Sequence, residues 1–202
     1  MTNGVNVTNR TVLITGANRG IGRALVNEAL KRGAKRVFAA SRVPLQIADE
    51  RVTTLILDVI DASQIQHAVD QVGSLDVLIN NAGIAAYDDL SNPAVVEQHL
   101  AVNFLGPLKV TNAFVPLLRV SRGAVVNNLS LAALAALPMI PAYSISKAAA
   151  FNRMKRKVAH SEAVSQAKSE IAADNIEDRL AALEKQDRIE QLLAELKQKR
   201  GA

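Results

Sequence analysis

The chain has 202 residues, of which 49% are apolar, so we expect one ordinary domain, or one domain with an appendage, that builds a hydrophobic core. The lack of cysteine excludes a disulfide scaffold, a Cys-ligated zinc site and a thiol nucleophile. The three histidines show no metal-ligand spacing, so we expect no metal site. The net charge of +5 suits anionic ligands but is modest for a nucleic-acid-binding protein, and we expect no nucleic-acid partner.

No basic segment followed by an apolar one, the pattern of a secretory signal, opens the chain. One uncharged window, residues 123–146, is long enough to cross a membrane, but Asn127, Asn128, Pro138 and Pro141 interrupt it. A buried strand followed by a loop fits this window better than a single helix does. We therefore expect a cytoplasmic protein without a membrane span.

The composition changes near residue 151. Residues 1–150 contain 13 Lys/Arg and 10 Asp/Glu, whereas the last 52 residues contain 11 and 9. All six prolines and nine of the ten glycines lie before residue 142, and the last aromatic residue is Phe151. The C-terminal part is rich in Ala, Leu, Glu and Lys, which favour helices. We therefore predict a domain at residues 1–152 and a helical appendage at residues 153–202.

Short apolar runs alternate with helical patterns along the first part. The apolar runs predict strands at Thr11–Thr15, Arg36–Ser41, Val52–Leu57, Leu75–Asn80 and Ala124–Leu129. The helical patterns predict helices at Ile21–Arg32, at Ala62–Val72, at Pro93–Leu118 with an interruption at Pro107, and from Ala142 onward. This alternation is typical of βαβ units, so we predict an α/β fold with a doubly wound parallel sheet that helices cover on both faces.

A glycine-rich turn, residues 15–22 (TGANRGIG), joins the first predicted strand to the first predicted helix. Glycines permit a tight turn and a close backbone approach, and a helix N-terminus offers free N–H groups to a pyrophosphate. Because the turn lies between a strand and a helix, it predicts a dinucleotide site rather than an ordinary connection. The residues expected to form it are Gly16, Asn18, Arg19, Gly20, Ile21 and Gly22.

The spacing G-x-x-x-G-x-G of this turn resembles that of the short-chain dehydrogenase/reductase family. Further features follow in that family's order: Asn103 in the long helix, Ser130 thirteen positions before Tyr143, and Tyr143-x-x-x-Lys147. Residues 80–83 (NNAG), after the fourth predicted strand, resemble another family signature. The resemblance extends from about residue 8 to residue 152 and implies a Rossmann-like sheet, for which we expect the strand order 3-2-1-4-5.

The resemblance implies roles for four residues. Tyr143 would be the general acid/base, giving a proton to a carbonyl oxygen or taking one from an alcohol. Lys147, one helical turn away, would stabilise the phenolate and hold the nicotinamide ribose. The Ser130 hydroxyl would polarise the substrate oxygen, and Asn103 would anchor a water in the proton relay. The nicotinamide would carry the hydride.

The resemblance also implies contacts with the rest of the cofactor. Asp58 would hydrogen-bond the adenine amino group, and Val59 would line the adenine ring. Asp58 has a second interpretation as a helix cap, which can coexist with the first. The backbone of Asn81, Ala82 and Gly83 would pass beneath the cofactor.

The residues after the second predicted strand indicate which cofactor binds. An acidic residue there would bind the ribose 2′-hydroxyl and favour NAD, but this chain has Ser41 and Arg42. Arg19 adds a second guanidinium, and two such groups suit a 2′-phosphate. We therefore expect NADP(H) rather than NAD; the alternative is that both arginines are ordinary solvated side chains.

The C-terminal part departs from the family. Two strands, a helix and a Pro-Gly turn normally follow the Y-x-x-x-K helix and complete the substrate pocket, but here a cationic run at Arg153–Lys157 follows. Without those strands, the fifth strand would form an exposed apolar edge. The tail pattern predicts two short helices with a break near Gln186, and it weakly resembles the helical C-terminus of phage-shock-protein-A-like membrane-stress proteins.

Together these features predict an NADP(H)-dependent oxidoreductase that interconverts a carbonyl and an alcohol. The uncharged stretch Leu131–Ala142 suggests a small apolar substrate. By the resemblance, the long helix and the Y-x-x-x-K helix would pack against their copies in a homo-oligomer. The alternative is a catalytically inactive cofactor-binding or scaffold protein whose helical tail mediates oligomerisation.

Overall fold

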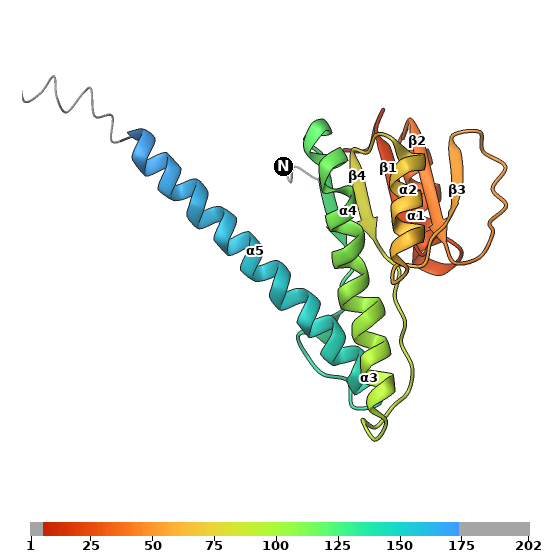
Figure 1. Cartoon of the computed structure of the whole chain (residues 1–202), viewed down its shortest axis with the longest axis vertical. Helices are drawn as coiled ribbons and strands as arrows, with labels where there is room; N and C mark the ends of the chain where they lie inside the picture. Colours follow the sequence, from red (N-terminus) through yellow and green to blue (C-terminus); the bar gives the residue numbers. More distant parts are fainter. Residues whose placement is uncertain (1–5, 174–202) are drawn as a thin grey trace, which may run out of the picture. The chain divides into compact units, whose positions relative to one another are not determined.

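The computed structural model describes residues 6–173 (Figure 1). The strands are β1 (Thr11–Thr15), β2 (Arg36–Ser41), β3 (Val52–Ile56), β4 (Val77–Asn80) and β5 (Ala124–Asn127). The α-helices are α1 (Gly20–Lys31), α2 (Ala62–Val72), α3 (Pro93–Leu100), α4 (Gly106–Ser121) and α5 (Pro141–Ala173). A π-helical turn, Ala101–Leu105, joins α3 to α4, and a 3-10 turn, Leu131–Ala133, follows β5.

The five strands form one parallel sheet in the order β3-β2-β1-β4-β5. Thr15 at the end of β1 is paired with Ala40 of β2, and Asn80 at the end of β4 is paired with Asn127 of β5. This register brings the carboxyl ends of the strands to a common edge of the sheet. The predicted fold class and strand order are confirmed.

Two apolar clusters form the core, one on each face of the sheet. Leu13 and Phe38 pack with Ile65 of α2 and with Phe114 of α4. Alternate residues of the same strands, such as Val12, pack on the other face with α1. Because side chains of a strand point alternately to opposite faces, fully buried strands need apolar residues on both, as β1 shows in its sequence TVLIT.

The predicted long helix Pro93–Leu118 is divided into α3, the π-helical turn and α4. Pro107 has no N–H and cannot donate to the carbonyl of Asn103, four residues earlier. The backbone is widened directly before this proline, which accounts for the interruption that the sequence predicts. α4 ends at Ser121, three residues beyond the predicted Leu118. The ends of the other elements differ from the predicted ones by two residues or fewer, the ordinary uncertainty of helix and strand boundaries.

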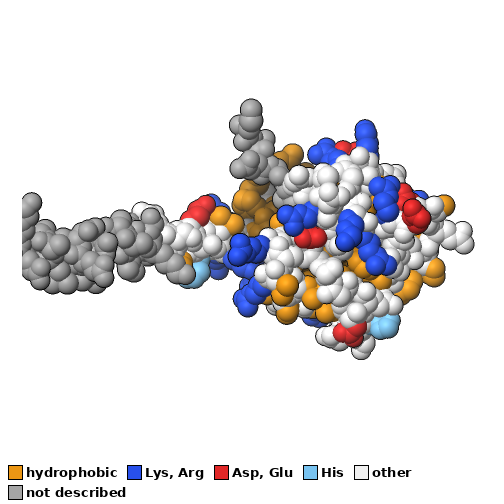
Figure 2. Space-filling view, turned by 90° about the horizontal axis from the view of Figure 1, so that it is seen from above, with side chains coloured by type: hydrophobic (Ala, Val, Ile, Leu, Met, Phe, Trp, Pro, Cys, Tyr) orange, Lys and Arg blue, Asp and Glu red, His pale blue; other side chains and the backbone are white. Residues whose placement is uncertain are grey.

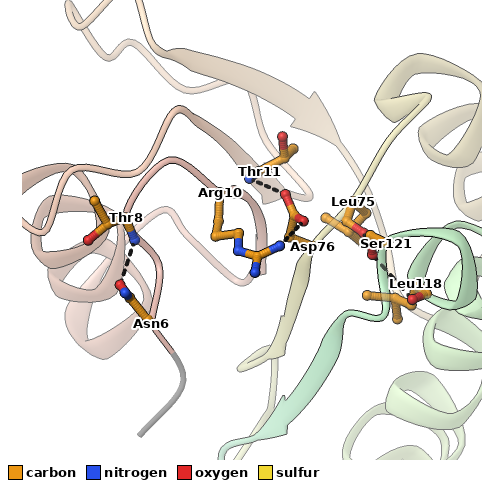
Figure 3. Close-up of polar contacts among 8 residues, drawn as sticks. All are labelled: Asn6, Thr8, Arg10, Thr11, Leu75, Asp76, Leu118 and Ser121. Atoms are coloured by element: carbon orange, nitrogen blue, oxygen red, sulfur yellow. Dashed lines mark hydrogen bonds and ion pairs between the residues drawn. The ribbon is translucent and has the colours of Figure 1, made fainter.

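Hydrogen bonds fix the start of β4 against its neighbours (Figure 3). The Asp76 carboxylate accepts from the Thr11 N–H and from the Arg10 guanidinium, both at 2.8 Å. Ser121, at the end of α4, donates its hydroxyl to the Leu75 carbonyl at 2.6 Å. These contacts hold β1, β4 and α4 together at the end of the sheet opposite to the strands' carboxyl ends.

Charged side chains of both signs lie on the surface of the described residues. On the face shown in Figure 2, Lys and Arg side chains lie among Asp and Glu side chains and uncharged surface. The ion pairs among residues 6–166, whose side chains the structure describes, are Arg10–Asp76, Arg32–Glu28 and Arg51–Asp49. Surface pairs of this kind contribute about 1 kcal/mol or less each, so the fold depends mainly on the two apolar clusters.

Within the described part of the chain, one helical stretch, Pro93–Ser121, is apolar and long enough to cross a membrane by length and composition alone. Three of its residues, Val110, Phe114 and Leu118, belong to the core cluster on the face of α2. Packing against the sheet accounts for an apolar helix of this kind in an α/β fold.

β5 is the last strand of the sheet in the described residues. Its side chains Val125 and Val126 are 38% and 36% exposed, whereas Leu13 and Ile14 of the central strand are fully buried. The expected exposed apolar edge is therefore present in the described structure.

The chain divides into two compact units, Met1–Arg153 and Met154–Ala202. α5 is continuous through this division, so the predicted boundary after residue 152 lies within a helix rather than in a linker. The two helices predicted around Gln186 lie outside the described residues.

Candidate active site

A cleft of about 700 Å³ lies at the carboxyl ends of the strands. The segments that follow all five strands contribute to its walls, which is where ligands bind in open parallel sheets. Every residue predicted to bind the cofactor lines this one cleft, and so does Ser130. Asn103 does not line it. The structure thus brings together residues that are up to 131 positions apart, from Gly16 to Lys147.

The glycine turn has no room for side chains at two positions. A Cβ at Gly22 would collide with the Gly16 carbonyl and would lie 2.6 Å from Nδ2 of Asn81. Gly16 has a φ of +68°, and a Cβ there would lie 2.9 Å from Cα of Ala82. The turn, the start of α1 and the loop after β4 are therefore packed backbone against backbone at the cleft.

The N-terminus of α1 is open to the cleft. No side chain caps it, and its first turn contains no acidic residue. α2 differs, because its first N–H groups donate to Asp61, at 2.9 Å from Ser63 and 3.0 Å from Gln64. Since Gly20–Gly22 line the cleft, the free N–H groups and the positive dipole end of α1 suit an anionic ligand.

Cations outnumber acids in the cleft. Arg19, Arg42 and Lys147 line it, and Asp58 is its one acidic lining residue among the residues described. Arg19 and Arg42 are exposed, and neither forms an ion pair within residues 6–166. Both guanidinium groups are therefore available to a ligand phosphate.

Ser41 and Asp58 shape the cleft through local hydrogen bonds. The buried Ser41 hydroxyl donates to the Val43 carbonyl and accepts from the Val43 N–H, which fixes the turn that carries Arg42. Asp58 accepts from the Ile60 N–H at 3.1 Å. The interpretation of Asp58 as a helix cap is wrong, because Asp61 caps α2.

Tyr143 and Lys147 lie one turn apart on α5. The ammonium of Lys147 is 5.6 Å from the centre of the Tyr143 ring and donates to the Asn128 carbonyl at 3.1 Å. Burial lowers the pKa of Lys147 below its usual value of 10.5, because burial disfavours the charged form. Ser130 starts the 3-10 turn by accepting from the Ala132 N–H, and its side chain lines the same cleft.

A sequence profile of the short chain dehydrogenase family matches residues 10–177, which is most of the chain. The chain belongs to the short-chain dehydrogenase family. It is 40% identical over 157 residues to the short-chain dehydrogenase PC-15 of Penicillium crustosum, a match that covers 69% of this chain and 56% of that protein. It is 34% identical over 160 residues to estradiol 17-beta-dehydrogenase 2 of Rattus norvegicus, with coverage of 71% and 42%.

The fold is similar to that of solved short-chain dehydrogenases. A short chain dehydrogenase from Burkholderia cenocepacia J2315 in complex with NADP has a TM-score of 0.72 and 32% identity; the match covers 75% of this chain and 66% of that one. The aldohexose dehydrogenase of Thermoplasma acidophilum has a TM-score of 0.64 and 27% identity, with coverage of 71% and 58%. The chain spans about half the length of the relatives it matches by sequence.

Asn103 does not line the cleft but is buried. It is 2% exposed and donates to the Ile84 carbonyl and to the Ser146 hydroxyl, both at 2.9 Å. Its side-chain oxygen accepts from the Ile84 N–H at 2.8 Å. The amide therefore joins the π-helical turn to the loop after β4 and to α5, contacts that the sequence did not reveal.

The N-terminus of α5, which carries Tyr143, is held by a carboxylate. Asp88, in the loop after β4, accepts from the Ala142 N–H at 3.2 Å and 3.3 Å through its two oxygens. A negative charge at a helix N-terminus is favourable, because it pairs with free N–H groups and with the helix dipole. Asp88 thus helps to position the helix of Tyr143, and no sequence motif had indicated it.

Seven further residues line the cleft and were missed in the sequence. Most directly precede or follow a predicted site residue at the end of a strand, so taking each strand end as a whole would have found them. They are Val43, Leu57, Ile84, Ala85, Val102, Asn128 and Leu129. Within the described part of the chain, no group of three or more His, Asp or Glu side chains could hold a metal ion.

A nicotinamide dinucleotide fits the residues present. The cleft offers a backbone cradle at Gly16 and Gly22, an uncapped helix N-terminus, and three cations against one acid. This donor set matches a pyrophosphate flanked by two nucleosides.

The buried position of Lys147 predicts how stability depends on pH in the cofactor-free protein. With a pKa lowered by burial, the folded state binds fewer protons than the unfolded state between that pKa and 10.5. The burial cost of Lys147 is therefore largest below the folded-state pKa and is relieved as the pH rises toward 10.5. We expect the free energy of unfolding of wild type, relative to Lys147→Met, to increase between pH 7 and pH 10 in urea titrations. A difference that does not change with pH would contradict this assignment.

Proposed function

We propose that this chain is an NADP(H)-dependent oxidoreductase that interconverts a carbonyl and an alcohol, with Tyr143 as the acid/base. One observation carries the proposal: a single cleft contains both the phosphate-binding turn and the group of Ser130, Tyr143 and Lys147. The bound nicotinamide would supply the hydride in reduction and accept it in oxidation. The protein supplies orientation and the movement of the proton.

Three side chains carry out the proton transfer in this proposal. In reduction, the Tyr143 hydroxyl gives its proton to the carbonyl oxygen, and in oxidation the phenolate takes the proton of the alcohol. The Lys147 ammonium, near the Tyr143 ring, stabilises the phenolate. The Ser130 hydroxyl donates a hydrogen bond to the substrate oxygen and polarises it.

The remaining lining residues hold the cofactor in this proposal. The turn Gly16–Gly22 and the N-terminus of α1 bind the pyrophosphate. Asp58 accepts a hydrogen bond from the adenine amino group, while Arg19 and Arg42 grip the 2′-phosphate. The similar Burkholderia cenocepacia dehydrogenase was solved with NADP, which supports this choice of cofactor.

The substrate that we propose is small and apolar. The cleft is lined by the apolar residues Leu129, Ile84 and Val102. The segment after Ser130 does not line the cleft, but it exposes Leu131, Leu134 and Met139, which are 83%, 70% and 65% exposed. These apolar side chains favour a carbonyl or alcohol without charged groups.

The test is a titration of the full chain with NADPH and, separately, with NADH, followed by nicotinamide fluorescence. The chain has no tryptophan, so indole does not contribute to the signal. We expect saturable binding that is tighter for NADPH, and oxidation of NADPH when apolar carbonyls are added. Binding without turnover of any carbonyl would favour the inactive cofactor-binding protein, a second candidate that the exposed β5 edge supports. No binding of either cofactor would overturn both.

Arg42 predicts a shift in cofactor preference. We expect Arg42→Ala to weaken NADPH binding by about tenfold or more, because a charged hydrogen bond contributes about 1.5–3 kcal/mol. NADH lacks the 2′-phosphate, so its affinity is expected to stay close to that of wild type. Arg119→Ala, at an exposed position on α4 outside the cleft, is the control for the loss of one positive charge. Equal losses for both cofactors would contradict the role of Arg42.

A further inference from the structure

Asn128, the residue directly after β5, forms hydrogen bonds through its backbone N–H, its backbone carbonyl and its side-chain Nδ2. Its N–H donates to the Asn80 carbonyl at 2.9 Å, and its own carbonyl accepts from Nζ of Lys147 at 3.1 Å. Its side-chain Nδ2 donates to Oδ1 of Asn81 at 2.9 Å. The residue lines the cleft and is half-buried. Asn128 therefore contacts the acid/base helix on one side and the loop after β4 on the other.

The direction of the hydrogen bond between Asn128 and Asn81 is fixed by the partners of Asn81. Its Nδ2 donates to the Thr15 carbonyl at 3.0 Å and to the Gly16 carbonyl at 3.3 Å. Carbonyl oxygens only accept, so the nitrogen of Asn81 must face them and its oxygen must face Asn128. Position 128 therefore has to supply a donor, which Asn does and an apolar or anionic residue of the same size does not.

We propose that Asn128 is a positioning residue that links Lys147 to the glycine-rich turn at residues 15–22. The link runs from Nζ of Lys147 to the Asn128 carbonyl, from the Asn128 amide to Asn81, and from the Asn81 amide to Gly16. This link keeps two parts of the cleft at a fixed separation. One is the glycine-rich turn, which would bind the pyrophosphate, and the other is Lys147, which would bind the ribose. The inference rests on the proposed function for the identity of the ligand, but the link itself is a property of the protein alone.

The neighbouring residue Asn127 shows that this contact is specific to position 128. Asn127 accepts from the Asn80 side chain at 2.9 Å, and Asn80 also donates to Thr111 of α4. Neither Asn80 nor Asn127 lines the cleft. The two successive asparagines therefore contact different parts of the protein, and the one at position 128 joins the parts of the site.

The first arm of the test measures amide hydrogen exchange in the cofactor-free protein. The N–H groups of Asn81 and Ala82 donate to Oγ1 of Thr15 at 3.0 Å, so their protection reports on the loop that Asn128 holds. In Asn128→Leu we expect these two amides to exchange about fivefold faster or more, with the amides of α2 unchanged, because local opening requires fewer contacts to break. Asn92→Leu removes a cap of α3 outside the cleft and is expected to leave both amides as in wild type.

The second arm measures NADP⁺ affinity by calorimetry at pH 8. We expect Asn128→Leu to bind about tenfold more weakly than wild type, because the half-buried Oδ1 of Asn81 loses its donor. Asn128→Asp, which keeps the size of the side chain, is expected to bind at least as weakly, because a carboxylate only accepts and would face the Asn81 oxygen. A purely electrostatic effect of the carboxylate on the cofactor would leave Asn128→Leu unaffected and would overturn the proposal.

The two arms separate the failure of this proposal from failure of the proposed function. Wild-type exchange of Asn81 and Ala82 in Asn128→Leu would overturn the link, whatever the cofactor affinity. If wild type binds neither NADP⁺ nor NADPH, the proposed function fails, and faster exchange of those two amides would still support the link.

Discussion

Replacing Tyr143 with Phe is expected to lower the turnover of a carbonyl substrate by a factor of about 10²–10⁴, the usual contribution of a positioned acid/base. The change removes only the hydroxyl oxygen and leaves the aromatic ring beside Lys147. The turn Gly16–Gly22 and both arginines are unaffected, so NADPH is expected to bind with wild-type affinity. The measurement is kcat at saturating NADPH, with affinity determined separately by nicotinamide fluorescence.

The chain offers a matched control for this variant. Its only other tyrosine, Tyr87, is 80% exposed and does not line the cleft. Tyr87→Phe removes the same atom at a position without contact to the reacting groups and is expected to retain full turnover. Equal rates for wild type and Tyr143→Phe would show that the proton comes from another group, and the enzymatic proposal would fail in its present form.

The fold could be predicted from the sequence because it depends on local patterns. Apolar runs such as Thr11–Thr15, separated by helical segments, force a parallel sheet with two covered faces. The positions of the strand ends were predicted less accurately, for a physical reason. Leu57 and Leu129 continue the apolar runs, yet they lie beyond the strands: both line the cleft, and Leu57 also belongs to the core cluster on the face of α2.

The candidate site was predictable wherever a residue type at a fixed spacing carries the chemistry. The glycine turn and the pair Tyr143 and Lys147 are of this kind, and all of them line one cleft. Contacts between distant segments were not predictable. The sequence offered two acids before α2 and did not show that Asp61 caps it, nor that Asp88 caps α5. Such choices depend on the three-dimensional approach of loops that have no periodic pattern.

Gly22→Ala is expected to have the largest effect on cofactor binding. On helix propensity alone, alanine at the start of α1 would stabilise the protein by about 0.5–1 kcal/mol. The added Cβ instead meets the Gly16 carbonyl and Nδ2 of Asn81. The carbonyl belongs to the backbone of the turn and cannot rotate away, so the turn itself must move. Overpacking of this kind costs the fold about 1–3 kcal/mol, and because the turn that binds the pyrophosphate is displaced, we expect NADPH affinity to fall by about tenfold or more.

Gly73→Ala separates this effect from a general loss of stability. Gly73 has a φ of +63° after α2, and no atom lies within 4 Å of a Cβ built there. The positive φ alone makes alanine unfavourable by about 1–2 kcal/mol, a cost similar to that at Gly22. Urea unfolding should therefore show comparable destabilisation in both variants, while only Gly22→Ala weakens NADPH binding. If the two variants bound NADPH equally well, the turn would tolerate displacement, and its close packing against Gly22 would not be what holds the pyrophosphate.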